Sequence, residues 1–592
     1  MSLIIAAKYL FIVTALFLGA CTGPDTHEDA TVDSIIDDVI TELYQTKSEP
    51  ELASLTHGQV MDLFSDDELQ VLGTRHWMFD VNVPVVVSVM RSSDQDIVPF
   101  WLTGIDFKKT DKIVRNRQVE YEIWQKSFDA GRVGLGINGI ENYRYHYFVC
   151  IGPQDENEEL ELSNFFPGEQ YVGTMEDGAF TYHDWSELVL MDVPAELKGQ
   201  KLLTTIRGRG VETHLVNAFR KTDHPSSNQP DHALLTWSSY PSTSIDIQWR
   251  TDTTVSAGIV KYREKGSDQV YTEDASVYVM EDLRLMNDRF MHRFTARLKD
   301  LNPGTSYEYL IVPQTSWEKT QTFTTAGDND SFSFIWFGDV HNSPKAGELH
   351  YMAEENHPET AFYAISGDLV GDGLYRNEWD ELFEYSKDVI SKKPLMTVPG
   401  NHDNRLGLGS KMFRDMLSYP TNGPDGVPEG QTYSFTYKNT LFLMLDSTSP
   451  SDTQTEWIDE QLSNTTATWK IAIFHFPPYN FNAPYYNIQE KWVPVFDKYH
   501  VDMVLGGHIH YYMRSKPMKA GEVVDSYNEG TAYIISIAIP ARDRSIGEEP
   551  YAEVRYSDGQ FYQHVNIDGD NLIYSAYDSE NNLVDSFQIK KP

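Results

Sequence analysis

The sequence predicts a multidomain chain in which two β-sandwiches precede an α/β domain. At 592 residues the chain is too long for one hydrophobic core, so two to four domains are expected. The apolar pattern changes along the chain, first from helical spacing to short β-branched runs near residue 77, and then to apolar strands alternating with helices near residue 331. Hydrophobic residues make up 40% of the chain and aromatic residues 13%, which is enough for several cores.

The charge balance argues against one class of partner. The chain has 88 acidic and 48 basic residues, a formal net charge of −40, and this charge repels a phosphate backbone. We therefore expect no binding to nucleic-acid polymers. The same field repels small phosphorylated substrates, so an enzyme acting on them would need local positive charge, which metal ions would supply. The sequence does not indicate an oligomeric state.

Residues 1–20 have the features of a targeting segment. Lys8 precedes an apolar stretch at residues 9–18, and Leu18-Gly19-Ala20-Cys21 resembles a bacterial lipoprotein signal. The resemblance implies a signal peptide over residues 1–20, lipidation of Cys21, and membrane attachment through that lipid at the bacterial outer membrane or cell surface. An uncleaved anchor or an ordinary secretory signal is the alternative, and the latter would give a periplasmic or secreted protein.

Residues 21–76 are expected to form a tether followed by short helices. From Val32 to Leu43 the apolar residues fall on one helix face. Thr56 and Ser65 are each followed three residues later by Gln or Glu, the pattern of a capping box. These helices are assigned no chemistry.

Residues 77–220 are expected to form a β-rich domain, most simply a sandwich, of unknown role. The clearest strand candidates are residues 81–90, 114–127, 143–151 and 201–207. Acidic residues at 155–161 fit no calcium-loop spacing and favour a solvated face. Cys150 lies in an apolar run and is expected to be buried, so the two cysteines predict no disulfide framework.

Residues 228–326 contain a second series of alternating strands. Residues 298–309, with Asn302-Pro303-Gly304 before Tyr307, resemble the E–F corner of a fibronectin type III-like sandwich. The resemblance implies that the Tyr307 hydroxyl bonds back across the corner. Such a domain is a spacer or a lid unless a site shows otherwise.

In residues 331–592, five apolar, strand-like runs end in residue types that bind metals. Ligands of α/β sheets bind beyond the carboxyl ends of the strands, where all of these residues fall. Mixed imidazole and carboxylate ligands suit Zn, Fe or Mn. The candidate ligands are Asp339, His341, Asp368, Asn401, His475, His508 and His510.

These pieces together resemble the calcineurin-like metallophosphoesterase superfamily. They are Gly338-Asp339-Val340-His341, Gly367-Asp368, Gly400-Asn401-His402-Asp403, His475 and Gly507-His508-Ile509-His510. The resemblance implies a four-layer α/β/β/α domain with two metal ions. It further implies that Asp339, His341 and His510 hold one ion, that Asp368 bridges, and that Asn401, His475 and His508 hold the second.

Two such ions, roughly 3.5–4 Å apart, would neutralise phosphate oxygens and activate a bridging hydroxide for attack on phosphorus. His402 is the candidate proton donor to the leaving group, because it lies beside the ligand Asn401 without being needed for coordination. Asp403 is the candidate support that fixes the tautomer of His402.

The order of domains over residues 231–592 is similar to that of purple acid phosphatases, with one departure. Purple acid phosphatases carry a tyrosine ligand three residues after the bridging aspartate and no histidine two residues after the first aspartate. Here Gly371 takes the tyrosine's place and His341 is present. The resemblance then implies no charge-transfer colour and leaves the metals open among Fe, Mn and Zn. Arg514, just after the last ligand pair, is a candidate substrate-binding residue.

The sequence thus predicts an extracytoplasmic metallophosphoesterase that hydrolyses small phosphate esters. Within the same superfamily the alternative is a phosphodiesterase or nucleotidase. From another class, the chain could be a surface binding protein with an inert phosphoesterase-like domain, although the complete ligand set argues against this.

Overall fold

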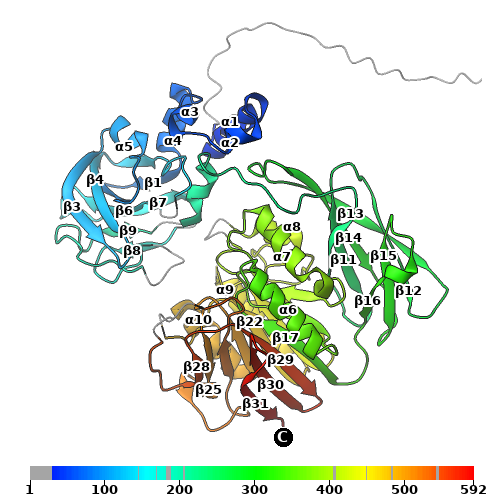
Figure 1. Cartoon of the computed structure of the whole chain (residues 1–592). Helices are drawn as coiled ribbons and strands as arrows, with labels where there is room; N and C mark the ends of the chain where they lie inside the picture. The colour runs from blue at the N-terminus through cyan, green and yellow to red at the C-terminus, as the bar shows by residue number, and fades with distance from the viewer. Residues whose placement is uncertain are drawn as a thin grey trace, which may run out of the picture.

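The computed structural model describes residues 30–592 except 144–145, 169, 182–187, 205–206, 405–408, 449, 482–484 and 542–545. Figure 1 shows an N-terminal part in blue to cyan, a β-sandwich in green, and a larger domain from green to red that carries the C-terminus. The fold class predicted from the sequence, two β-sandwiches that precede a four-layer α/β domain, is confirmed.

Four short helices open the described chain, namely α1(Val32–Thr46), α2(Glu49–Leu52), α3(His57–Met61) and α4(Asp66–Thr74). The buried residues of α1 run from Val32 to Leu43 along the expected face. Thr56 and Ser65 cap α3 and α4 as expected, each completing a reciprocal capping box with the residue three positions on.

The N-terminal sandwich consists of a three-stranded sheet, order β5-β1-β7, and a six-stranded sheet, order β3-β4-β2-β6-β9-β8. The two sheets bury one cluster that includes Trp77 and Phe79 from one side and Val87 and Val149 from the other. Its elements are β1(Trp77–Val81), β2(Val85–Ser92), α5(Phe100–Gly104), β3(Lys108–Arg115), β4(Glu120–Phe128), β5(Gly131–Leu135), β6(Phe148–Pro153), β7(Leu162–Phe166), β8(Val172–Thr174), β9(Lys201–Leu203) and the 3₁₀ helix η1(Arg207–Thr213).

Two expected strands of this domain have other bounds in the structure. The run at residues 81–90 is divided between β1 and β2, because Pro84 has no amide hydrogen with which to continue a strand. The run at residues 201–207 ends at Leu203, and η1 begins at Arg207, where two glycines disfavour a strand. Cys150 lies buried in β6, as expected.

The second sandwich has strand order β10-β11-β14-β13-β12-β15-β16, with the long β13 pairing on both sides. The Tyr307 hydroxyl accepts a 2.8 Å hydrogen bond from the Asn302 amide, which confirms the expected corner. The side chains of β13 are mostly exposed and show little apolar alternation, so its sequence gives only a weak strand signal. The elements are β10(Asp231–Thr236), β11(Ile245–Thr251), β12(Gly258–Glu264), β13(Tyr271–Glu281), β14(Phe290–Leu298), β15(Ser306–Ile311), the 3₁₀ helix η2(Trp317–Lys319) and β16(Gln321–Thr324).

The C-terminal domain contains two facing mixed sheets, of order β19-β18-β17-β29-β30-β31 and β20-β21-β22-β23-β27-β24-β28. Its helices are α6(Pro344–Asn356), α7(Arg376–Ile390), α8(Lys411–Met416), α9(Asp452–Asn464), α10(Tyr486–Lys491) and α11(Val493–Tyr499). Its strands are β17(Ser331–Phe337), β18(Phe362–Ile365), β19(Leu395–Thr397), β20(Tyr433–Tyr437), β21(Thr440–Leu445), β22(Trp469–Phe474), β23(Met503–Gly506), β24(Tyr512–Ser515), β25(Met518–Lys519), β26(Glu522–Val523), β27(Ala532–Ile535), β28(Ala552–Tyr556), β29(Phe561–Asp568), β30(Asn571–Asp578) and β31(Leu583–Lys590).

Alternation along the strands builds the layers of this domain. Phe442 and Met444 of β21 join the core between the two sheets, whereas Leu441 and Leu443 join the cluster beneath α9 and α11. Helices α6 and α7 cover the outer face of the other sheet. The resulting order is helix, sheet, sheet, helix, as expected.

The second sandwich packs firmly against the C-terminal domain. The Trp237 ring lies among Phe362 and Tyr437, with ring centroids 5.5 and 5.4 Å away. The buried Arg250 pairs with Asp380 of α7 at 2.6 Å. Within the described part of the chain, no helix has the length and apolar character needed to cross a bilayer.

Candidate metal centre

All seven predicted ligands meet at one edge of the paired sheets. Each follows the carboxyl end of a strand, and parallel strands bring such ends together at one edge. Asp339 and His341 follow β17, Asp368 follows β18, Asn401 follows β19, His475 follows β22, and His508 and His510 follow β23.

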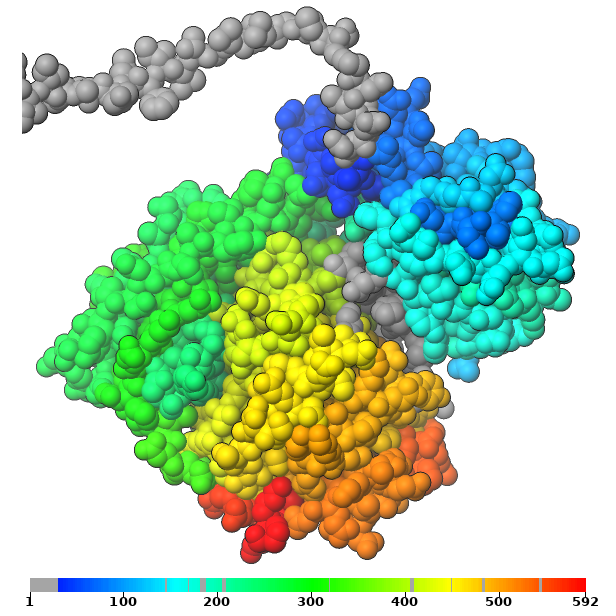
Figure 2. Space-filling view, turned by 180° about the vertical axis from the view of Figure 1, so that it is seen from behind, coloured from blue at the N-terminus to red at the C-terminus, as the bar shows by residue number. Residues whose placement is uncertain are grey.

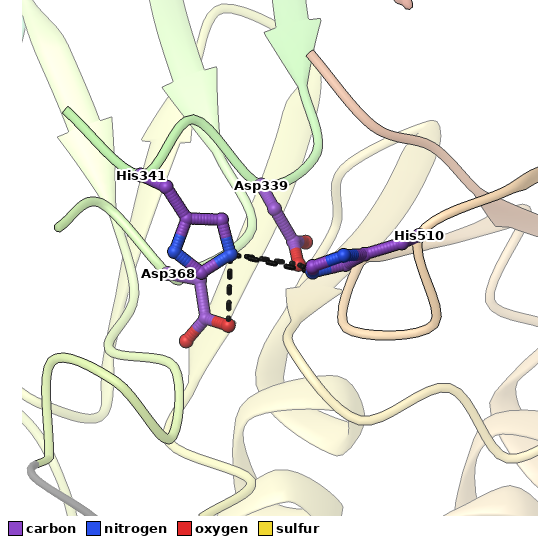
Figure 3. A group of neighbouring side chains, drawn as sticks. All are labelled: Asp339, His341, Asp368 and His510. Carbon is purple, nitrogen blue, oxygen red and sulfur yellow. Dashed lines mark hydrogen bonds and ion pairs between the residues drawn. The ribbon is translucent and has the colours of Figure 1, made fainter. Parts of the chain in front are cut away.

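The first ligand group consists of Asp339, His341, Asp368 and His510, whose donor atoms all lie within 4.8 Å of one another. His510 Nε2 is 2.9 Å from Asp339 Oδ2. His341 Nε2 is 3.6 Å from Asp368 Oδ2 and 3.3 Å from His510 Nε2. Figure 3 shows the four side chains converging on one space. Two carboxylates and two imidazoles around one point are a suitable donor set for a divalent metal.

The second group shares Asp368 and adds His475 and His508. His475 Nε2 lies 3.2 Å from Asp368 Oδ2 and 3.0 Å from Asn401 Oδ1. The His508 ring packs edge-on to that of His475, with centroids 5.1 Å apart. Asp368 therefore belongs to both groups.

Backbone carbonyls fix the histidine tautomers. His475 Nδ1 lies 2.9 Å from the Ser366 carbonyl and His341 Nδ1 lies 3.3 Å from the Val370 carbonyl. Because a carbonyl only accepts, each Nδ1 must carry the hydrogen, and each Nε2 lone pair faces the other ligands. This is the tautomer that a metal-binding histidine needs.

Each of the ligand carboxylates Asp339 and Asp368 accepts a backbone hydrogen bond with one oxygen, and its other oxygen faces the histidine ligands. Asp339 Oδ1 accepts a 2.7 Å hydrogen bond from the His508 amide, and Asp368 Oδ1 accepts a 2.9 Å bond from the His402 amide. Among the described residues, the buried Asp339 Oδ2 has no hydrogen-bond partner apart from the imidazoles of the ligand group, of which His510 Nε2 lies 2.9 Å away. A buried carboxylate oxygen beside imidazole lone pairs is costly unless a cation joins them, so the residues fit a metal.

The electrostatics of the centre favour positive charge. Burial alone would lower the pKa of His475, but the carboxylates of Asp368 and Asp339 raise it to about 9. Burial likewise opposes protonation of His341, and Asp339 and Asp368 raise its pKa to about 9. The protein field at this point thus stabilises a cation.

The backbone is strained where it carries the ligands. His341, Asp368, His508 and His510 all have positive φ, between 43° and 71°. Such conformations are costly for residues with a side chain and cluster at functional sites. Gly400 permits a close approach, because a Cβ there would lie 2.2 Å from Asp368 Oδ1.

His402 lies next to the centre, but its support differs from the prediction. Its Nδ1 donates a 2.6 Å hydrogen bond to the Gly371 carbonyl, and its ring lies edge-on to that of His341, with centroids 4.8 Å apart. The Asp403 carboxylate instead accepts hydrogen bonds from the amides of Leu369, Val370 and Gly400. The assignment of Asp403 as the tautomer-fixing partner was wrong, because its side chain points at the loop after Asp368.

The assignment of Arg514 to substrate binding is also corrected. Its guanidinium is buried and binds both oxygens of Asp585, at 2.7 and 2.9 Å, and the Tyr527 hydroxyl at 2.6 Å. Its donors thus hold β24 to β31 instead of facing a substrate. The predicted lipidation site, Cys21, lies outside the described residues.

Two further side chains lie beside the centre. The Phe476 ring packs on His508 with centroids 4.6 Å apart, and Asn404 donates to Thr448 Oγ1. The position of Phe476 directly after His475 is a local signal that places it at the rim of the centre. For Asn404 the partner is 44 residues away, and no local pattern points to it.

Comparisons with known proteins agree with this geometry. Residues 332–512 match the profile of the calcineurin-like phosphoesterases, and residues 230–325 match that of the purple acid phosphatase N-terminal domain. Both predicted resemblances are thereby confirmed for these segments.

Two relatives illustrate the level of similarity. An uncharacterized protein of Mycobacterium tuberculosis H37Rv is 26% identical over 277 residues, which cover 39% of this chain and 52% of that protein. Purple acid phosphatase 15 of Arabidopsis thaliana is 29% identical over 300 residues, which cover 43% and 54% of the two chains. The chain thus spans about half the length of these curated relatives.

A solved structure shares the fold. Purple acid phosphatase PPD1 from yellow lupin superposes with a TM-score of 0.54 at 15% identity, covering 88% of this chain and 91% of that one.

Proposed function

We propose that the chain hydrolyses small phosphate esters at a centre of two metal ions. The premise is that a segment matching the purple acid phosphatase N-terminal domain is followed by a segment matching the calcineurin-like phosphoesterases. The observation that carries the proposal is the pair of ligand groups that share Asp368. Asp339, His341 and His510 would hold one ion, and Asn401, His475 and His508 the other, with Asp368 contributing to both.

Such ions, when bound, neutralise phosphate oxygens and activate water as the nucleophile. The chain supplies orientation and a proton. The His341, His402, His508 and His510 side chains retain some exposure while Asp339 and Asp368 are buried, so a phosphate approaches the centre from the histidine side. His402, whose Nδ1 donates to the Gly371 carbonyl, would in its imidazolium form give the Nε2 proton to the departing alkoxide.

We propose that the bound metals are Fe, Mn or Zn. Position 371 is a glycine whose carbonyl accepts from His402, so it offers no phenolate ligand. We therefore expect a colourless or weakly coloured protein.

We also propose an extracytoplasmic location with a lipid anchor at Cys21, which rests on the signal-like residues 1–21. A phosphodiesterase or nucleotidase of the same superfamily remains the alternative within this enzyme class.

His402→Asn tests the proton-donor role. Turnover of an alkyl monoester such as glycerol phosphate should fall by about 10²–10⁴-fold, because its leaving group needs a proton. Turnover of p-nitrophenyl phosphate should fall far less, because p-nitrophenolate leaves without one. Metal content should be unchanged.

His500→Asn is the matched control, since His500 lies at the end of α11, outside both ligand groups. Its activity should equal that of the parent on both esters. Equal losses on the two esters in His402→Asn, or loss of metal, would remove the proton-donor assignment.

A further inference from the structure

A pocket of about 240 Å³ lies between the N-terminal sandwich and the rim of the metal centre. Tyr171 and Phe180 of the N-terminal sandwich form one wall, and Phe476, Tyr485 and Tyr486 form the other. In Figure 2 the N-terminal sandwich, in cyan, lies beside the yellow and orange part of the C-terminal domain. Two parts of the chain that are some 300 residues apart thus enclose one space.

Two aromatic rings that line the pocket also pack on a residue of the second ligand group. Phe476 and Tyr485 stack with centroids 4.6 Å apart and an interplanar angle of 3°. Both rings pack edge-on to the ligand His508, at 4.6 and 5.7 Å. A phosphate at the metal centre would therefore place its ester group beside this pair of rings.

The wall from the N-terminal sandwich is apolar and exposed. Tyr171 is 53% exposed and Phe180 is 38% exposed, whereas rings such as Trp77, Phe79 and Trp101 of the same domain are buried. Exposed apolar side chains that gather at a pocket mark a binding surface.

The residues that line the pocket favour the binding of a neutral ring. The described residues around the pocket include aromatic rings, Ser447, Thr448 and Asn487, but no charged side chain. In a chain of net charge −40 the described part of this lining is uncharged and lies beside a centre whose residues would hold cations. The volume is below the roughly 300–1,000 Å³ of sites for drug-sized ligands, and therefore suits one ring system better than a polymer segment.

We propose that this pocket binds an aromatic ring in the alcohol part of the phosphate ester, with Tyr171 and Phe180 as specificity-determining residues. The N-terminal sandwich thereby completes the substrate site. Offset or edge-on contacts with the ring, together with its removal from water, provide the preference. The inference rests on the proposed function, because the metal centre has to hold the phosphate.

Binding of two phosphonates tests the proposal without turnover, because their P–C bond is not hydrolysed. The metal-loaded full chain should bind phenylphosphonate about tenfold more tightly than methylphosphonate in calorimetric titration. Tyr171→Ala and Phe180→Ala should remove most of this difference and leave methylphosphonate binding unchanged. Both side chains are exposed, so the fold should tolerate their loss.

Tyr240→Ala is the matched control, a 77% exposed tyrosine on the second sandwich. It should leave both affinities unchanged. Equal affinity of the parent for the two phosphonates, or unaltered preference in both pocket variants, would overturn the inference while leaving phosphate-ester hydrolysis intact. If neither phosphonate binds, both the inference and the proposed function are contradicted.

The natural source of the ring is decided by kcat/KM. Adenosine monophosphate against ribose 5-phosphate tests a nucleobase, and phenyl phosphate against glycerol phosphate tests a simple aryl group. An advantage in either pair, lost on Phe180→Ala, supports the inference and identifies the source. No advantage in either pair contradicts it.

Discussion

The Asp403 carboxylate holds together the two loops that carry Asp368 and Asn401. It accepts hydrogen bonds from the Leu369 amide at 2.9 and 3.1 Å, from the Val370 amide at 3.2 Å and from the Gly400 amide at 2.8 Å. Asp403 is 2% exposed, so water does not readily replace it. Asp403→Ala would leave three buried amides without an acceptor.

Each unpaired buried amide costs about 1–3 kcal/mol, so the variant should lose at least about 3 kcal/mol of unfolding free energy. For a domain of this size that loss lowers the Tm by about 6–12 °C. Metal affinity should fall by about 10–100-fold, because the amides position the residues next to two ligands.

Scanning calorimetry and metal analysis at limiting metal measure both effects. Glu460→Ala, an exposed change on α9 of the same domain, is the control and should shift the Tm by no more than about 2 °C. An Asp403→Ala chain that melts within 2 °C of the parent and keeps its metal would refute the role given to Asp403 here.

Two further predictions concern groups outside the metal centre. Arg514→Met leaves the Asp585 carboxylate buried without its cation. The free energy of unfolding should fall by about 3–5 kcal/mol, and KM should not change. A large rise in KM at unchanged stability would instead support Arg514 as a substrate ligand. Burial raises the pKa of Glu212 in the N-terminal domain from 4.5 to about 7, so the folded chain binds this proton more tightly than the unfolded chain. The associated stability is present below pH 4.5 and is lost as pH rises through about 7. Glu212→Gln should therefore show a smaller fall in the Tm of this domain between pH 5 and pH 7.5, and an identical fall would contradict the assignment.

The metal ligands could be predicted from the sequence because each depends on a local pattern. His475 directly follows the buried strand β22, and Asp339 and His341 closely follow β17. A strand end is a local property, and the meeting of parallel strand ends at one edge needs no knowledge of distant partners. The capping boxes at Thr56 and Ser65, and the corner at Tyr307, were likewise local.

The roles that failed depend on distant partners. Arg514 is paired with Asp585, 71 residues later, and no pattern near Arg514 in the sequence predicts that pair. Asp403 bonds to amides 34 residues earlier as well as to Gly400. The pocket could not be predicted from the sequence at all, because Tyr171 and Tyr485 line the same space only through the packing of two domains.

In the proposed centre one carboxylate, that of Asp368, is shared by two metal ions. Metal analysis of the purified chain, of Asn401→Ala and of Asp368→Ala tests it most directly. Because Asn401 belongs to one ligand group and Asp368 to both, we expect two ions per parent chain, about one in Asn401→Ala, and fewer than one in Asp368→Ala. Retention of two ions by Asp368→Ala, or a single ion in the parent chain, would contradict the account.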